Sequence, residues 1–179
     1  MNKALLTFKN GGVVICPTDT VYGFLADATN KKAVDKIFKI KKRPKLKPLP
    51  IFVKDIKMAK ELAEINKEQE KILRKYWPGK YTFILKRKPN IKLYGVHKNT
   101  IAIRIPKYKF LNNLLKKINK PLAQTSVNIS GEPPFAKIED IVERFGKNKD
   151  VLIINARNFK ISKPSKIIDL TNENKRILR

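Results

Sequence analysis

Short apolar runs alternate irregularly along this chain with segments whose apolar residues have helical spacing. Residues 13–16 (Val-Val-Ile-Cys), 81–86 and 100–105 have the continuous or alternating apolar patterns of strands. Residues 31–40 instead carry an apolar stripe at the spacing of an amphipathic helix. Because strands and helices do not alternate strictly, the pattern predicts an α/β (α+β) fold in which helices flank a twisted, mixed β-sheet.

The remaining elements fit one continuous domain. We expect residues 81–86 and 100–105 to form antiparallel neighbours across the polar loop between them. Further helices are predicted at 3–9, 56–63, 67–76, 110–118 and 138–145, and further strands at 51–53, 122–125, 151–154, 167–170 and 177–178. No internal repeat, low-complexity tract or linker interrupts the sequence. We therefore expect a single domain over residues 1–179.

The chain is strongly basic. Its 179 residues include 41 Lys and Arg against 15 Asp and Glu, which gives a formal net charge of +26. A field of this sign attracts polyanions and makes their binding sensitive to salt, so nucleic acid, nucleotide phosphates and anionic membrane surfaces all fit it. Most of the basic residues are Lys, however, and lysine-rich surfaces are often only solvated. Charge alone therefore leaves both interpretations open.

Several classes of protein are excluded by what the sequence lacks. No apolar run approaches the roughly 20 residues that cross a bilayer, and Gly11 and Gly12 interrupt the N-terminus before a secretory signal forms. We therefore expect a cytoplasmic protein with no membrane segment. The single cysteine, Cys16, and the single histidine, His97, leave no cluster for a metal site such as zinc or for a Cys/His hydrolase. His97 lies in a polar loop, and we expect it at the surface.

The carboxylates are poorly placed for acid–base catalysis. Most acidic residues fall on predicted helices beside lysines, and only Asp19, Asp27 and Asp169 lie near strand ends. A hydrolase that uses paired carboxylates is therefore a poor fit. An enzyme with this sequence would act by positioning its substrates and by stabilising charge.

Three polar segments depart from the ordinary pattern. Residues 17–23 (Pro-Thr-Asp-Thr-Val-Tyr-Gly) follow the buried strand at 13–16, where open sheets place ligands. Residues 39–48 hold six cations before a proline-stiffened loop, which suits a phosphate clamp. Residues 124–134 offer hydroxyls and backbone N–H groups, which bind anions. Each segment also fits an ordinary turn or a solvated helix end.

Six short motifs run in order along nearly the whole chain. They are Pro-Thr-Asp-Thr-Val-Tyr-Gly at 17–23, Lys41-x-Arg43-Pro44, Trp77-Pro78-Gly79-x-x-Thr82, Thr100-x-Ala102-x-Arg104-x-Pro106, Thr125-Ser126-x-Asn128-x-Ser130-Gly131, and Ser165 ahead of Ile168-Asp169. Together they resemble the TsaC/YrdC-like threonylcarbamoyl-adenylate synthases. Any one motif is weak, but six in family order are highly specific. The resemblance implies a YrdC-like fold.

The resemblance implies an enzyme that converts L-threonine, bicarbonate and ATP into threonylcarbamoyl-AMP and pyrophosphate. This product feeds the threonylcarbamoyl modification of adenosine 37 in tRNA (t6A), which further t6A transferase machinery completes. ATP is then a substrate, and we expect Mg2+ to accompany it. Charge builds on phosphate oxygens during such a reaction, so cations and oriented donors are what the chemistry needs. The basic face is then a candidate surface for tRNA.

The resemblance also assigns roles to individual residues. Lys41 and Arg43 are implied as the catalytic cations. The positions implied to bind ATP are Arg43, Lys47, Thr100, Ser126, Asn128, Pro134 and Arg179, and those implied to bind threonine are Thr20, Phe52, Arg104 and Gln124. Alternation along the strand places Arg104 on one face with Thr100 and Ala102. Its guanidinium suits the threonine carboxylate, and pairing with Asp169 or Asp19 is the alternative.

Two other functions fit parts of the same pattern. A non-catalytic RNA-binding relative would keep the basic sheet and lose the amino-acid site, and the departures from the family pattern at Phe52 and Lys166 are consistent with it. A carbamoyl-adenylate-forming domain like that of HypF-type hydrogenase maturation proteins is the second alternative. The presence of both Lys41-x-Arg43 and Thr125-Ser126-x-Asn128 favours the synthase.

Overall fold

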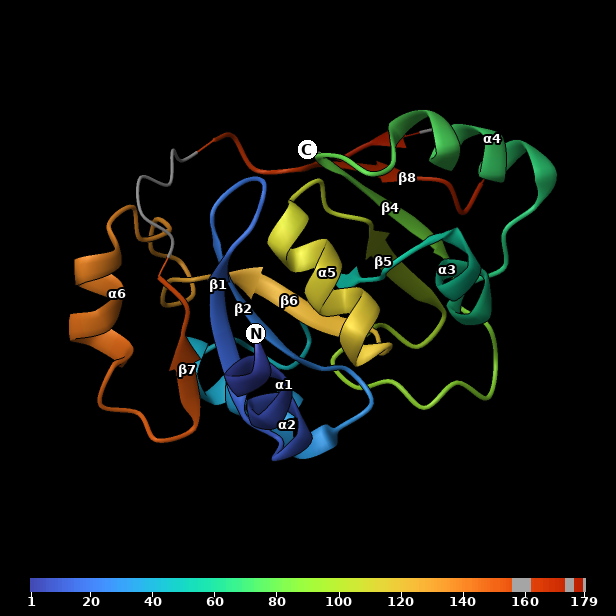
Figure 1. Ribbon diagram of the computed structural model, residues 1–179. Coiled ribbons are helices and arrows are strands. Elements are labelled where there is room, and N and C mark those ends of the chain that lie inside the picture. The colour runs from blue at the N-terminus through green and yellow to red at the C-terminus, as the bar shows by residue number, and fades with distance from the viewer. Residues whose placement is uncertain (156–161, 173–175, 179) are drawn as a thin grey trace.

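A mixed β-sheet of nine strands is the framework of the protein, as a computed structural model shows for residues 1–155, 162–172 and 176–178 (Figure 1). The strands are β1 (Val13–Pro17), β2 (Tyr22–Asp27), β3 (Ile51–Phe52), β4 (Tyr81–Lys86), β5 (Thr100–Arg104), β6 (Leu122–Ser126), β7 (Val151–Ile153), β8 (Lys166–Asp169) and β9 (Arg176–Ile177). They lie in the order β7-β1-β2-β6-β3-β5-β4-β8-β9.

Parallel and antiparallel pairs are interspersed in this sheet. β1 pairs with β7, β3 with β5 and β4 with β8 in parallel, and the other neighbours are antiparallel. The mixed sheet predicted from the sequence is therefore confirmed. The expected antiparallel pairing of β4 with β5 is also confirmed, with Phe83 opposite Ile103.

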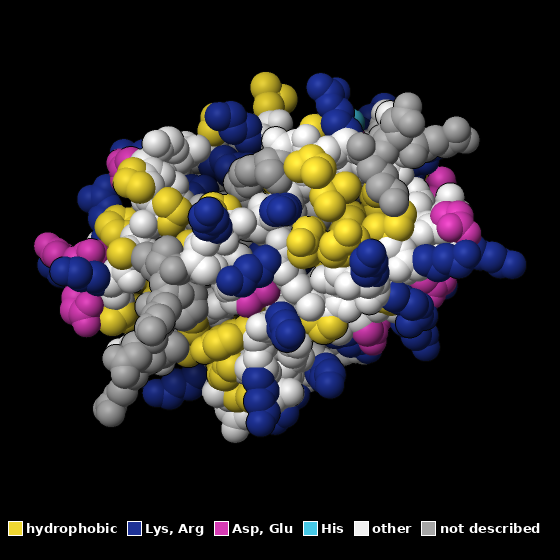
Figure 2. All heavy atoms as spheres, turned by 90° about the horizontal axis from the view of Figure 1, so that it is seen from above, with side chains coloured by type: hydrophobic (Ala, Val, Ile, Leu, Met, Phe, Trp, Pro, Cys, Tyr) yellow, Lys and Arg dark blue, Asp and Glu magenta, His cyan; other side chains and the backbone are white. Residues whose placement is uncertain are grey.

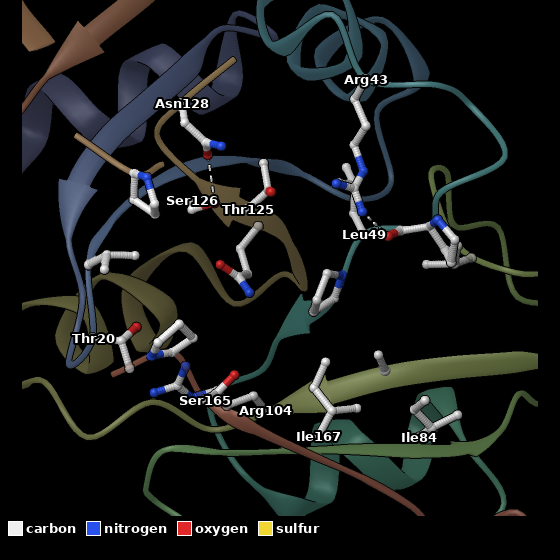
Figure 3. A pocket seen from close by; sticks show the side chains of 18 of the residues that line it. Thr20, Arg43, Leu49, Ile84, Arg104, Thr125, Ser126, Asn128, Ser165 and Ile167 are labelled. Atoms are coloured by element: carbon white, nitrogen blue, oxygen red, sulfur yellow. Dashed lines mark hydrogen bonds between the residues drawn. The ribbon is translucent and has the colours of Figure 1, made fainter. Parts of the chain in front are cut away.

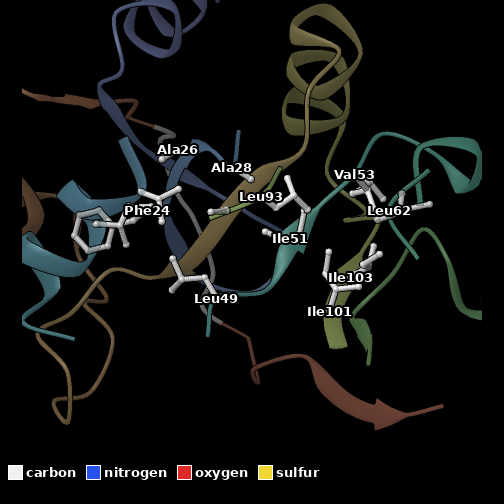
Figure 4. Packing of buried hydrophobic residues seen from close by; sticks show 14 of the residues in the cluster. Phe24, Ala26, Ala28, Leu49, Ile51, Val53, Leu62, Leu93, Ile101 and Ile103 are labelled. Carbon is white, nitrogen blue, oxygen red and sulfur yellow. The ribbon is translucent and has the colours of Figure 1, made fainter. Parts of the chain in front are cut away.

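Helices cover both faces of the sheet. In the described part of the chain they are α1 (Asn2–Lys9), α2 (Lys31–Lys41), α3 (Ile56–Leu62), α4 (Lys67–Tyr76), α5 (Lys109–Ile118) and α6 (Ile138–Phe145). α1 and α5 join Val14 and Leu25 in one apolar cluster, whereas α2 packs with Val13 and Phe24 on the opposite face. In that second cluster, Phe24 lies with Ile51 of β3 and Ile103 of β5 (Figure 4). No described helix reaches the length and hydropathy of a membrane-spanning one.

Burial on both faces explains the continuous apolar run at residues 13–16. Val13 and Ile15 point toward α2, whereas Val14 and Cys16 point toward α1 and α5. A strand covered on both sides needs apolar residues at every position rather than at alternate ones. Burial also raises the pKa of Cys16 to about 12, so its thiol behaves as an apolar group.

The sequence prediction missed β2. This strand lies between β1 and β6, and every residue of it is buried. Gly23, Ala26 and Asp27 are unfavourable strand residues, so tertiary burial rather than local propensity makes this segment extended. Asp27 ends the strand, where its carboxylate accepts hydrogen bonds from Thr29 N (2.9 Å) and Lys120 Nζ (2.6 Å). The polar segment 17–23 therefore turns the chain from β1 directly into β2.

Replacing a core leucine of β2 should destabilise the protein far more than replacing an exposed one. Leu25 has no exposed surface, so Leu25→Ala should lower the free energy of unfolding by about 2–5 kcal/mol, because it removes buried methyl groups and leaves a cavity. Leu46 is 96% exposed, so Leu46→Ala should change it by less than about 0.5 kcal/mol. Urea unfolding of both variants measures the difference, and equal effects would contradict the packing of β2.

Candidate active site

Segments that lie far apart in the sequence line a cavity of about 510 Å3 (Figure 3). Its size is in the range of small-molecule sites. The walls come from the β1–β2 turn, the loop between α2 and β3, Ile84 of β4, strand β5 with the loop before it, strand β6 with the loop after it, and residues 164–167. All three polar segments singled out in the sequence contribute, through Thr20, Arg43 and Gln124 among others.

The ammonium group of Lys41 holds the loop after β6 in place. Lys41 ends α2, and its Nζ donates hydrogen bonds to Ser126 O (2.8 Å), Asn128 O (3.2 Å) and Asn128 Oδ1. Ser126 Oγ donates to the same Oδ1 (2.7 Å), while Asn128 Nδ2 donates to Glu132 O (2.6 Å). Lys41 itself is only 2% exposed and lies behind the cavity wall. This geometry makes Lys41 a support for the loop, and the direct catalytic role expected from the sequence stays a prediction.

The environment of Lys41 lowers the pKa of its ammonium group. Burial, followed by the positive charge of Arg43, lowers the pKa of Lys41 to about 8. The hydrogen-bond partners of its ammonium group are neutral oxygens, which orient the group without adding a negative charge. Lys41 is therefore mostly charged at pH 7 and loses its charge as the pH rises through about 8.

Arg43 connects the cavity to the proline-rich loop before β3. Its Nε donates a hydrogen bond to Lys47 O (2.9 Å), and its Nη2 donates to Pro48 O (3.0 Å). The side chain extends beside Leu49 into the cavity (Figure 3). Burial lowers the pKa of Arg43, but an arginine remains a cation at neutral pH. A positive charge is thus held at the cavity wall by two carbonyl groups.

Strand β5 presents alternate residues to the cavity, as its sequence predicts. Thr100, Ala102 and Arg104 line the cavity, whereas Ile101 and Ile103 lie in the apolar core. The two-residue period of an extended strand produces this division. The buried isoleucines fix the strand, and the strand in turn fixes where the Arg104 side chain starts.

Arg104 forms one of the ion pairs that the sequence offered as alternatives. Its Nη2 donates a hydrogen bond to Asp19 Oδ1 at 2.6 Å, and the two side chains are 2% and 6% exposed. Arg104 lines the cavity despite this pairing. The pairing with Asp19 is therefore a finding, and recognition of a threonine carboxylate by Arg104 stays a prediction.

The turn at residues 77–79 supports Arg104 from behind. Gly79 O accepts a hydrogen bond from Arg104 Nε (2.9 Å). A Cβ atom on Gly79 would come within 2.5 Å of Tyr76 O, so no larger residue fits without moving the backbone. Trp77 is 6% exposed and donates from Nε1 to Tyr81 O (2.8 Å), which anchors the turn in the core. This motif therefore serves the cavity indirectly.

The remaining predicted residues fall into separate groups. Those that line the cavity are Thr20, Thr100, Gln124, Ser126, Asn128 and Pro134. Lys47 is exposed and Phe52 is fully buried, and neither lines the cavity. Phe52 packs among the leucines of α5, and its ring centre lies 5.7 Å from Arg104 Cζ. Arg179 lies outside the described residues.

Some lining residues were not expected from the sequence. His97, expected at the surface, is exposed and also lines the cavity, where its Nδ1 shares a hydrogen bond with Thr100 Oγ1 (3.1 Å). Ser165 also lines it, and its Oγ shares a hydrogen bond with Thr82 Oγ1 (3.0 Å). An apolar part of the wall consists of Pro48, Leu49, Ile84, Val96 and Ile167. Ser165 belonged to a sequence motif. The signal in the sequence that could have indicated His97 is its position three residues before Thr100.

Comparison with known proteins relates this fold and site to a family. A profile of the Sua5/YciO/YrdC family, described as "Telomere recombination", matches residues 7–179. The chain belongs to this family. The match begins within α1 and includes every segment that lines the cavity.

Relatives in the Sua5/YciO/YrdC family differ in length from this chain. A Methanocaldococcus jannaschii protein, named as a candidate threonylcarbamoyl-AMP synthase, is 41% identical over 92% of this chain and 77% of its own. The threonylcarbamoyl-AMP synthase of Pyrococcus abyssi is 34% identical over 91% of this chain and 48% of its own. The crystal structure of P. abyssi Sua5 with L-threonine gives a TM-score of 0.89 at 32% identity, covering 99% of this chain and 52% of that one. This chain thus spans about half the length of the Pyrococcus protein.

The affinity for a non-hydrolysable ATP analogue should fall as the pH rises through about 8. The charged form of Lys41, which orders the loop of Ser126 and Asn128, is present below its pKa of about 8 and is lost above it. Calorimetric titrations between pH 7 and pH 9 measure this loss. Lys41→Arg, which stays charged over that range, should bind with little pH dependence. A wild-type affinity that does not change with pH would contradict the role given to Lys41.

Proposed function

We propose that this protein is a threonylcarbamoyl-AMP synthase, which makes threonylcarbamoyl-AMP and pyrophosphate from L-threonine, bicarbonate and ATP. The names of the M. jannaschii and P. abyssi relatives support this activity. The observation that carries the proposal in this chain is one cavity whose described wall residues include two arginines at separate places. Arg43 lies at the proline-rich loop, and Arg104 lies at the end of β5.

The triphosphate of ATP binds at Arg43 and the loop after β6. Arg43 lines the cavity as a cation, and Ser126 and Asn128 line it beside the buried charge of Lys41. Phosphate oxygens prefer such a combination of cations and oriented donors. Thr100 and Pro134 line the same cavity, and the exposed Lys47 lies on the loop that Arg43 holds. These are the residues that we assign to ATP.

Threonine binds near Arg104, Thr20 and Gln124. Arg104 supplies a guanidinium for the carboxylate, and Gln124 supplies a side-chain amide from the neighbouring part of the wall. Thr20 is 5% exposed, and its hydroxyl shares a hydrogen bond with Thr18 Oγ1 (3.0 Å). Phe52 contributes only through the face of its ring beneath Arg104. The Pyrococcus Sua5 structure with L-threonine supports an amino-acid site in this fold.

The reaction needs no side-chain nucleophile. The amine of threonine attacks the carbon of bicarbonate, and water leaves to give a carbamate. A carbamate oxygen then attacks the α-phosphorus of ATP, and pyrophosphate leaves with the electrons of the broken P–O bond. Negative charge grows on the phosphate oxygens during this displacement, where Arg43 and the charge of Lys41 stabilise it. The protein contributes mainly by holding the carbamate and the α-phosphorus together.

Mg2+ accompanies ATP in this proposal. The described residues contain no group of three His, Cys, Asp or Glu side chains that could hold a metal ion by themselves. Mg2+ commonly binds through substrate phosphates and one or two carboxylates, and Glu132 is a carboxylate in the cavity wall. The site therefore fits Mg2+ carried by the triphosphate, whose negative charge it would reduce.

Release of pyrophosphate should require ATP, L-threonine and bicarbonate together, in the presence of Mg2+. The carbamate must form before it can attack the α-phosphorus, so omission of either threonine or bicarbonate should reduce release to background. A coupled pyrophosphate assay with each component omitted in turn tests the proposal. Equal release without threonine would contradict it.

One substitution in the proposed phosphate site and one matched control can be compared in the same assay. Arg43→Ala should reduce the use of ATP about 10- to 100-fold, because a charge-assisted hydrogen bond contributes about 1.5–3 kcal/mol. Lys32→Ala, on the exposed side of α2, should leave the rate within about twofold. Similar losses from both variants would indicate a diffuse positive field rather than a phosphate site at Arg43.

We also propose that tRNA binds to the basic surface and that the product passes to the t6A transferase machinery in the cytoplasm. Lysine and arginine side chains are spread over the face shown in Figure 2 rather than gathered at one place. A second hollow of about 550 Å3, however, is lined by Lys86, Arg87, Lys88 and Lys98, and Glu64 is the acidic residue among its described lining residues. Thr100 lines both this hollow and the main cavity. Phosphates of an RNA backbone therefore fit beside the synthase site.

Binding of tRNA should weaken as salt increases. The logarithm of the affinity should fall linearly with the logarithm of the salt concentration, with little dependence on RNA sequence. Lys88→Ala should lower the slope by about 1, which is the loss of one phosphate contact, while Lys3→Ala on α1 should not change it. Filter binding at several salt concentrations measures these slopes. A flat dependence on salt would indicate that the lysines are only solvated.

A further inference from the structure

Asp19 contacts the cavity only through another residue. It lies in the β1–β2 turn, where its Oδ1 accepts a hydrogen bond from Arg104 Nη2 (2.6 Å) and its Oδ2 accepts one from Lys107 N (3.0 Å). Its side chain is 6% exposed and does not line the cavity, whereas Arg104 does. Asp19 therefore joins the turn to the end of β5 across the base of the site.

The guanidinium of Arg104 is held on several sides. Gly79 O accepts from Nε (2.9 Å), and the Phe52 ring lies under the group at 5.7 Å. Among the described side chains, Asp19 provides the carboxylate that is ion-paired with Arg104. A guanidinium that is 2% exposed needs such a partner, because an unpaired buried charge is costly.

We infer that Asp19 is a positioning residue for the amino-acid substrate, because it fixes the direction and balances the charge of Arg104. This inference rests on the proposed function, in which Arg104 receives the carboxylate of threonine. Asp19 meets Arg104 through one oxygen only, since Lys107 N occupies the other. The pair therefore lacks the two-point geometry that an arginine forms with a fully engaged carboxylate. Asp19 thus sets the direction of the guanidinium with one oxygen, while its other oxygen holds the backbone just after β5.

An asparagine cannot replace Asp19 in this role. Both oxygens of Asp19 accept from an N–H group, whereas the amide of asparagine has one oxygen and one NH2 donor. Whichever way the amide turns, its NH2 group faces another donor, either Arg104 Nη2 or Lys107 N. The guanidinium or the end of β5 must then move, and threonine loses its aligned partner.

Direct binding of L-threonine, measured by calorimetry, tests the inference without requiring turnover. Asp19→Asn should raise the Kd for threonine about tenfold or more and leave the Kd for a non-hydrolysable ATP analogue within about twofold. An unchanged threonine Kd would overturn the inference. Wild-type protein that binds threonine but releases no pyrophosphate would contradict the proposed function and leave this inference standing, whereas wild-type protein that binds no threonine would overturn both.

Asp27→Asn is the matched control for a loss of stability. The Asp27 carboxylate is 4% exposed, and its two oxygens likewise accept hydrogen bonds, from Thr29 N (2.9 Å) and Lys120 Nζ (2.6 Å). Asp27 does not line the cavity. Its substitution should lower the melting temperature as Asp19→Asn does, with the threonine Kd within about twofold of wild type. An equal rise in Kd for both variants would show a general structural effect and overturn the inference.

A double variant separates an indirect role from an independent one. Because Asp19 acts through Arg104, Asp19→Asn combined with Arg104→Lys should bind threonine within about twofold of Arg104→Lys alone. Losses that multiply would overturn the inference. If Asp19→Asn does not fold, Asp19→Glu replaces it, because glutamate keeps the charge and both acceptors but displaces them by one methylene. Asp19→Glu should raise the threonine Kd about threefold or more, and an unchanged Kd in that variant would also overturn the inference.

Discussion

The buried ammonium group of Lys41 connects the two sides of the cavity wall. Its Nζ holds the carbonyl oxygens of Ser126 and Asn128, and its own carbonyl oxygen accepts a hydrogen bond from Ser130 N (2.8 Å). The end of α2 is thereby tied to the loop after β6 at both the side chain and the backbone. Removing the lysine would take this donor away from the carbonyl oxygens of Ser126 and Asn128. A buried acceptor that loses its donor costs stability.

The cations of the site are compensated in different ways. Arg104 is paired with the carboxylate of Asp19, so its charge is balanced within the protein. The hydrogen bonds of Lys41 and Arg43 go instead to neutral oxygens, and no described carboxylate forms an ion pair with either. At one end of the cavity the cations therefore have no carboxylate partner among the described residues, whereas at the other end Asp19 balances Arg104. This asymmetry matches a triphosphate at the first end and an amino acid at the second.

Much of the fold and part of the site followed from the sequence, because they depend on local patterns. The alternation in β5 correctly separated Thr100 and Arg104 from the core isoleucines. β2 was missed because its glycine, alanine and aspartate residues disfavour a strand, and the segment is extended because it pairs with β1 and β6 in the sheet. The resemblance implied that Phe52 binds threonine. In the structure Phe52 lies beneath Arg104 and packs against α5, and no local sequence pattern encodes this packing. The choice of Asp19 over Asp169 as the partner of Arg104 likewise depends on which turns meet at the end of β5.

The two hydrogen bonds from Arg43 to the proline-rich loop make that loop thermodynamically linked to whatever anion occupies the cavity. The same guanidinium that faces the ligand also fixes the carbonyl groups of Lys47 and Pro48. An anion that holds Arg43 in this orientation also lowers the conformational freedom of the loop, and by reciprocity a stiffer loop binds that anion more tightly. A substitution at an exposed loop residue such as Leu46, which does not line the cavity, is therefore expected to change the affinity of the cavity for that anion.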